Sequence, residues 1–159
     1  MRDLPLGPTY LRGVLPTTTA KFFRTRMTNS STPMPMPGAH AALQAVQGAG
    51  LRCALFTNPS FPQGAIECRM GWGDLADAPF ELVTHMGNAT RCKPDATYYL
   101  EQLQVMGLEP HEVLMVGNDP KRDFPSPACG IQTAYVGQGK PNRVTWRGTM
   151  EGFARDFTP

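Results

Sequence analysis

Apolar residues along this chain fall into short groups with two kinds of spacing. Residues 39–48 carry Ala42, Leu43 and Val46 at helical spacing, and glycines at the end of this stretch stop the pattern, which predicts a helix. Residues 53–56 form a continuous apolar run, typical of a strand buried on both faces of a parallel sheet. By the same criteria we predict helices over 62–70, 94–106 and 150–157, and strands over 80–84, 113–116 and 131–136.

The predicted strands and helices alternate along the chain. Such alternation requires right-handed crossovers and yields a Rossmann-like α/β fold, in which a mostly parallel sheet is flanked by helices. In sheets of this kind, ligands bind beyond the carboxyl ends of the strands. The residues that directly follow each predicted strand are therefore the candidates for function.

Composition fits one globular domain and argues against several classes of protein. The chain has 159 residues, of which 41% are hydrophobic and 18% charged. No apolar run approaches the roughly 20 residues that cross a bilayer, so we expect no membrane span, and a net charge of +2 gives no reason to expect nucleic-acid binding. The four cysteines include no C-x-x-C pair, which argues against a zinc site or a disulfide framework and favours reduced thiols in the cytoplasm.

Positive charge is concentrated at the start of the chain. Residues 1–33 contain one acid, Asp3, and the following bases: Arg2, Arg12, Lys21, Arg24 and Arg26. We expect this Thr- and Pro-containing segment to be poorly ordered and the α/β domain to occupy residues 34–159, with the stiff Pro-Met-Pro-Met-Pro sequence at the boundary. The segment also has the composition of a transit peptide, so import into an organelle is the alternative to a cytoplasmic location.

Two carboxylates follow the predicted strand at 113–116. Asp119 comes after Gly117, whose lack of a side chain lets a ligand approach the backbone, and Asp123 lies four residues further on, within reach across one helical turn. Two such oxygen donors suit Mg²⁺ together with water and a phosphate. The structural alternative is that Asp119 caps the following turn and Asp123 is solvated.

Three more polar residues occupy comparable positions elsewhere in the chain. Thr57 and Asn58 follow the strand at 53–56 and offer a hydroxyl and an amide to an oxyanion, or else begin a turn. Lys93 precedes a predicted helix, where the helix macrodipole disfavours a cation unless an anionic ligand or the Asp119 carboxylate holds it there. The alternative for Lys93 is an ordinary surface lysine.

In their order and spacing, these residues resemble the motifs of the haloacid dehalogenase (HAD) superfamily of phosphohydrolases. In that family a hydrophobic strand ends in Thr or Ser, a Lys precedes a helix, and a later strand ends in G-(N)-D-x-x-x-D. The corresponding sequences here are Ala54-Leu-Phe-Thr57, Lys93-Pro94 and Gly117-Asn-Asp-Pro-Lys-Arg-Asp123. The resemblance extends from about residue 35 to residue 136.

The resemblance implies a role for each of these residues. Thr57 and Lys93 would be the catalytic residues: Thr57, with Asn58, would bind the oxygens of the phosphoryl group, and Lys93 would neutralise its charge. Asp119 would bind Mg²⁺, and Asp123 would support the metal or bind it directly. Such a site acts by positioning and electrostatic stabilisation of the transferring group.

One motif of the family has no counterpart in this sequence. The family's nucleophile and general acid/base are the two Asp of a D-x-D-x-(T/V) motif on the first strand, which lies in the middle of the sheet. Asp3 is the single acid before Thr57, and D-x-D occurs nowhere in the chain. We therefore expect the central strand to be missing or replaced, and residues 10–15 make a poor replacement because of Gly13 and the following Pro16.

The sequence leaves three interpretations open. The favoured one is a shortened, catalytically impaired HAD phosphatase-like hydrolase whose chain starts too late or has lost a segment near its start. The second is a non-catalytic member that binds Mg²⁺ and a small phosphorylated ligand or a protein partner. The third is an imported domain that needs a partner chain. The sequence specifies neither the substrate nor the oligomeric state, and whether the chain is an active enzyme depends on which interpretation holds.

Overall fold

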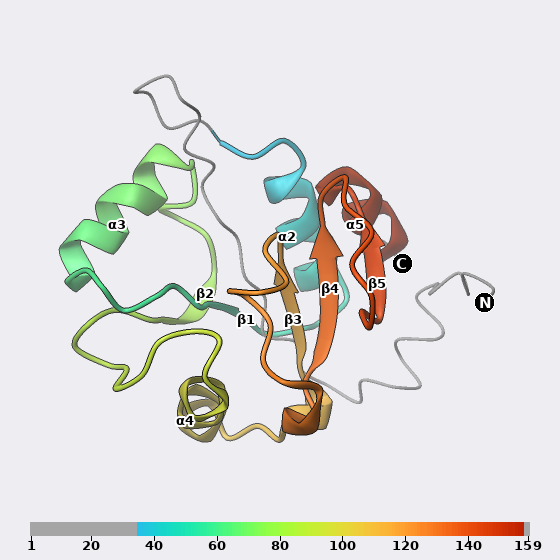
Figure 1. The fold of residues 1–159 in the computed structure, drawn as a ribbon. Helices are drawn as coiled ribbons and strands as arrows, with labels where there is room; N and C mark the ends of the chain where they lie inside the picture. Colours follow the sequence, from blue (N-terminus) through green and yellow to red (C-terminus); the bar gives the residue numbers. More distant parts are fainter. Residues whose placement is uncertain (1–34, 158–159) are drawn as a thin grey trace.

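Five short strands and four α-helices are found in residues 35–157, which are the residues that the computed structural model describes (Figure 1). In chain order the elements are α2 (Ala39–Gly48), β1 (Cys53–Leu55), α3 (Gln63–Trp72), β2 (Phe80–Val83), α4 (Ala96–Met106), β3 (Leu114–Gly117), β4 (Gln132–Val136), β5 (Trp146–Gly148) and α5 (Met150–Phe157). Two short 3-10 helices, Pro110–Glu112 and Pro127–Cys129, flank β3 in the sequence.

The strands form two parallel sheets. β1 pairs with β2, and β3 pairs with β4, which in turn pairs with β5. The predicted α/β class, with parallel strands and flanking helices, is therefore confirmed. Within residues 35–157 no strand joins β1 to β3. The predicted N-terminal segment 1–33, and with it the poor substitute strand at 10–15, lies outside the described residues.

Helix α2 connects the two sheets. It contacts β1 and packs along α5, and α5 contacts β5. Ala42 and Val46 of α2 are completely buried, and Phe153 of α5 is buried as well. The close approach of the helices depends on Gly38, because its φ is +79° and a Cβ there would lie 2.8 Å from the backbone nitrogen of Glu151. The α2–α5 pair therefore links β1 of one sheet to β5 of the other.

The structure differs from the predicted elements by one or two residues at several boundaries and by one additional strand. Helix α4 begins at Ala96 rather than at Pro94, because Asp95 is its N-cap and accepts a hydrogen bond from the backbone N–H of Thr97 at 2.8 Å. Strand β5 was not predicted, since its three residues include an exposed arginine and form no apolar run. None of the helices in the described part combines the length and apolar character needed to span a membrane.

Candidate phosphate and metal site

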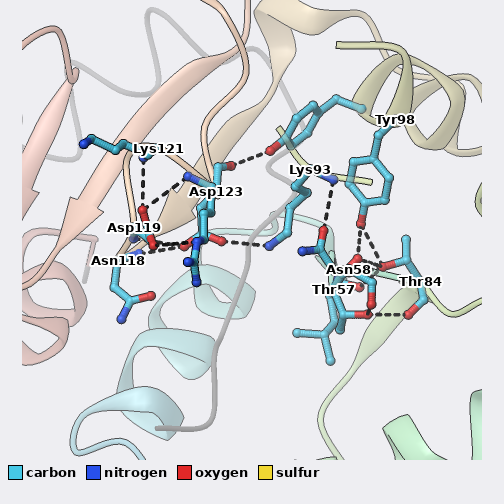
Figure 2. Close-up of polar contacts among 12 residues, drawn as sticks. Thr57, Asn58, Thr84, Lys93, Tyr98, Asn118, Asp119, Lys121 and Asp123 are labelled. Carbon is cyan, nitrogen blue, oxygen red and sulfur yellow. Dashed lines mark hydrogen bonds and ion pairs between the residues drawn. The ribbon is translucent and has the colours of Figure 1, made fainter. Parts of the chain in front are cut away.

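Lys93 and Asp123 form an ion pair beside the carboxyl ends of the strands (Figure 2). Lys93 Nζ donates to Asp123 Oδ1 at 2.8 Å, and the two side chains are only 4% and 6% exposed. Charges this deeply buried occur in proteins when they are paired. Lys93 is therefore no ordinary surface lysine, and the carboxylate that holds it belongs to Asp123 rather than to Asp119.

The Asp123 carboxylate organises the loop that follows β3. Its Oδ2 accepts hydrogen bonds from the backbone N–H groups of Asn118 at 3.2 Å and Asp119 at 3.0 Å. A Cβ on Gly117 would lie 2.7 Å from Asp123 Cβ, so the space beside this glycine is occupied by Asp123 rather than left for a ligand. The backbone carbonyl of Asp123 accepts from the Tyr99 hydroxyl at 2.6 Å. Asp123 is thus buried with both carboxylate oxygens accepting hydrogen bonds, and the alternative that it is solvated is wrong.

The Asp119 carboxylate lies nearer the surface. Its Oδ1 accepts hydrogen bonds from the backbone N–H groups of Lys121 at 3.1 Å and Arg122 at 3.2 Å, so Asp119 does cap the turn after β3. Its Oδ2 lies 3.7 Å from Arg122 Nε, and the side chain is 31% exposed. Capping therefore leaves one carboxylate oxygen near the solvent.

Thr57 is bound to Thr84 where β1 and β2 end. The Thr57 N–H donates to Thr84 Oγ1 at 2.7 Å, and the Thr57 hydroxyl donates to the Thr84 carbonyl at 2.9 Å. Next to it, Asn58 Oδ1 accepts from the backbone N–H of Lys93 at 3.0 Å. This hydrogen bond holds the Lys93 backbone beside the residues that follow β1.

Sequence reasoning missed the tyrosine that completes this cluster. The Tyr98 hydroxyl donates to the Thr57 carbonyl at 2.6 Å and lies 2.9 Å from Thr84 Oγ1. Burial raises the pKa of Tyr98, an effect that the Thr84 hydrogen bond partly opposes, and burial also raises the pKa of Tyr99. Both hydroxyls therefore keep their protons and remain donors. The rings of both tyrosines are completely buried, and the available signal was that a buried Tyr hydroxyl usually has a hydrogen-bond partner.

The five predicted site residues converge. Hydrogen bonds join Asn58 to the Lys93 backbone and Lys93 Nζ to Asp123 (Figure 2). A further hydrogen bond joins Asp123 Oδ2 to the Asp119 backbone, and Thr57 is adjacent to Asn58. These contacts bring residues from the β1–β2 sheet and the β3–β5 sheet to one place. The convergence expected from their positions after the strands is found.

The oxygen donors at this place suit a metal ion that is bound partly by the protein and partly by a phosphate ligand. Within residues 35–157 there is no group of three or more His, Cys, Asp and Glu side chains that could hold a metal ion. The Asp123 oxygens already accept hydrogen bonds from Lys93 and from backbone N–H groups, which leaves Asp119 as the carboxylate that could reach a cation. Mg²⁺ is commonly bound through one or two carboxylates, with water and phosphate oxygens completing its shell. Asp119 fits that mode of binding, whereas the described side chains do not form a complete metal cage.

Several solved structures share this fold. A HAD phosphatase from Thermococcus onnurineus aligns with a TM-score of 0.61 and 20% identity, over 75% of this chain and 56% of its own. A HAD-superfamily hydrolase from Geobacter sulfurreducens PCA aligns with a TM-score of 0.60 and 21% identity, over 76% of this chain and 54% of its own. An uncharacterized protein from Listeria monocytogenes serotype 4b has a TM-score of 0.67 and 16% identity, over 89% of this chain and 94% of its own. The chain thus spans little more than half the length of the first two.

The family assignment comes from the sequence match. No curated protein is significantly similar to this chain. The family model described as haloacid dehalogenase-like hydrolase matches residues 18–129, well over half of the chain. This match includes Thr57, Lys93 and both aspartates of the site. The chain therefore belongs to the haloacid dehalogenase-like hydrolase family.

Proposed function

We propose that this protein binds Mg²⁺ and a small phosphate monoester at the site formed by Thr57, Asn58, Lys93, Asp119 and Asp123, and that it hydrolyses the ester poorly. The observation that carries the proposal is the buried Lys93–Asp123 pair, which lies within one hydrogen bond of the Asp119 backbone. A fixed cation beside a partly exposed carboxylate is an arrangement suited to a metal–phosphate complex. The family membership and a HAD phosphatase among the similar folds support the same ligand class.

Each residue has a part in binding. Lys93 offsets phosphate charge, and Asp123 holds the lysine ammonium and the Asp119 loop in place. Asp119 supplies a carboxylate oxygen to the metal, whose charge, when it is bound, stabilises the negative phosphoryl oxygens. Thr57 would exchange its hydrogen bond to the Thr84 carbonyl for one to a phosphate oxygen. Asn58 fixes the backbone before Lys93, so the ammonium is oriented before the ligand arrives.

Poor hydrolysis follows from the chemistry of the carboxylates. The family reaction needs an attacking carboxylate, and the sequence has no D-x-D motif to supply it. The two site carboxylates are already engaged, Asp119 as a turn cap and metal ligand and Asp123 as the partner of Lys93. The described residues therefore provide binding and charge stabilisation without an evident nucleophile. The same observation favours the second candidate, a protein that binds the phosphorylated ligand without turning it over.

The test measures binding and turnover on the same protein. Titration calorimetry with inorganic phosphate, with and without Mg²⁺, should show Mg²⁺-dependent binding that Asp119→Asn weakens at least about tenfold. The control Asp77→Asn changes an exposed carboxylate before β2 and should bind like the parent. Hydrolysis of 4-nitrophenyl phosphate should be slow but above the Asp119→Asn background.

Two results would contradict the proposal. Failure of the folded protein to bind phosphate in the presence of Mg²⁺ would exclude the binding function. Rapid Mg²⁺-dependent turnover that disappears in Asp119→Asn but persists in Asp77→Asn would exclude the impairment, and would show that a carboxylate outside the described site acts as nucleophile. Binding with slow turnover above the Asp119→Asn background favours an impaired hydrolase, and binding with none favours a purely binding protein.

A further inference from the structure

A cavity of about 560 Å³ has Asn118, the residue next to Asp119, in its lining. It is lined by Asn118 after β3, by residues 135–138 at the end of β4, by residues 149–151 at the start of α5, and by residues 36–37 before α2. It therefore opens at the carboxyl ends of parallel strands, where ligands bind in sheets of this kind. Its volume lies in the range of pockets that hold small organic molecules.

Asn118 belongs both to this cavity and to the phosphate site. Its backbone N–H donates to Asp123 Oδ2, while its side-chain amide points away from Lys93 and Thr57 (Figure 2) and lines the cavity. The next residue is Asp119, and consecutive Cα atoms are only about 3.8 Å apart. A ligand whose phosphate lies beside Asp119 can therefore extend into the cavity without a long linker.

The lining groups favour hydroxyls and disfavour anions. Asn118, Gln138 and Glu151 are exposed and have no side-chain hydrogen bond within residues 35–157, so their amides and carboxylate are available to a ligand. Among the described residues of the lining, Glu151 is the single charged one, and Val136 and Met150 give the floor an apolar part. A carboxylate accepts strong hydrogen bonds from hydroxyl groups and repels a second anion.

We propose that this cavity binds the alcohol part of the phosphate ester, and that this part is an uncharged polyol or sugar. The inference rests on the proposed function, because the phosphate must occupy the neighbouring site. The amides of Asn118 and Gln138 and the carboxylate of Glu151 bind the ligand's hydroxyl groups. The apolar floor packs against its carbon skeleton. Esters whose alcohol part carries a carboxylate are disfavoured by Glu151.

Calorimetry with three ligands in Mg²⁺ buffer tests this assignment: inorganic phosphate, glucose 6-phosphate and phosphoglycolate. Glucose 6-phosphate should bind about tenfold more tightly than inorganic phosphate, and Gln138→Ala should remove most of that advantage while leaving inorganic phosphate unchanged. Glu151→Gln should raise the affinity for phosphoglycolate severalfold. The control Gln44→Ala, on the exposed face of α2, should alter none of the three affinities.

The outcomes separate the two proposals. Equal affinities for glucose 6-phosphate and inorganic phosphate, or a Gln138→Ala variant that weakens both equally, would overturn the assignment of the cavity and leave phosphate binding intact. An unchanged preference against phosphoglycolate in Glu151→Gln would overturn the charge selection. Absence of inorganic phosphate binding by the folded parent protein would reject the proposed function, and the cavity assignment with it.

Discussion

The Lys93 ammonium lies 2.8 Å from the Asp123 carboxylate, although 30 residues separate them in the sequence. The lysine precedes α4 and follows the β1–β2 sheet, whereas the aspartate follows β3 of the other sheet. Their contact therefore fixes the relative position of the polar loops at the ends of both sheets. Because Asp123 also accepts from the Asn118 and Asp119 N–H groups, one buried carboxylate joins the Lys93 segment to the loop after β3.

Replacing Asp123 with alanine should destabilise the protein strongly. The change leaves the Lys93 ammonium buried without its carboxylate, and loss of one partner of a buried pair typically costs about 3–5 kcal/mol. Urea unfolding measures the difference. The matched control is Glu81→Ala, which removes one partner of the partly exposed Arg52–Glu81 pair and should cost less than about 1 kcal/mol. Equal losses in the two variants would show that burial gives the Lys93–Asp123 pair no special weight.

Tyr98→Phe tests the hydroxyl that binds the end of β1. The variant keeps the buried ring but removes the donor to the Thr57 carbonyl, so the free energy of unfolding at neutral pH should fall by about 1–2 kcal/mol. Phosphate affinity should also fall, because the loop carrying Thr57 loses an anchor. A variant as stable as the parent protein would contradict the contribution assigned to this bond.

Because Tyr98 and Tyr99 are buried, we expect the protein to lose stability at high pH. Burial raises the pKa of Tyr98 and of Tyr99 above the ordinary value of about 10, so above that pH the unfolded chain releases protons that the folded protein retains. Their contribution is complete below about pH 10, and above it the free energy of unfolding falls by up to about 1.4 kcal/mol per pH unit for each tyrosine. Unfolding measured from pH 8 to 11 should show this fall, with a shallower slope in Tyr98→Phe. Parallel slopes above pH 10 would refute the assignment.

Thr57→Val separates the hydroxyl from the shape of the side chain. If the hydroxyl binds a phosphate oxygen, the variant should lose about tenfold in affinity for inorganic phosphate, whereas Thr57→Ser should retain it. The valine variant also leaves the Thr84 carbonyl without this donor, at a cost to stability of about 1 kcal/mol. Unchanged phosphate affinity in a folded valine variant would assign the Thr57 hydroxyl a structural role alone.

The sequence predicted the convergence of the site because that property depends on topology. In α/β folds, ligands bind at the carboxyl ends of the parallel strands, so Thr57, Asn58 and Asp119 could be expected at one place from their positions alone, although β1 and β3 lie in separate sheets. Apolar runs located β1 and β3 because parallel strands that are buried on both faces are continuously hydrophobic. Strand β5 escaped because it is a short strand with an exposed arginine and lacks that pattern.

The side-chain pairing within the site could not be predicted. Lys93 had Asp119 and a ligand as conceivable partners, and the choice of Asp123 depends on how far each carboxylate is buried, which only the packed structure determines. The spacing of the two aspartates gave no sign that one caps an exposed turn while the other fills the space beside Gly117. Burial and packing across 30 residues of chain, rather than local propensity, decide these contacts.

Gly117→Ala should show that this space is needed. A Cβ at this position would lie 2.7 Å from Asp123 Cβ and 3.0 Å from Asp123 Oδ2, which would push the carboxylate out of its buried place. Overpacking of this kind costs about 1–3 kcal/mol, and phosphate affinity should fall with it because Asp123 holds Lys93. The control Gly64→Ala adds a methyl group where no atom lies within 4 Å in α3, and should be neutral or stabilising by up to about 1 kcal/mol. If Gly117→Ala retained both the stability and the phosphate affinity of the parent protein, the Asp123 carboxylate would not need its observed position, and the part assigned to it in organising the site would be wrong.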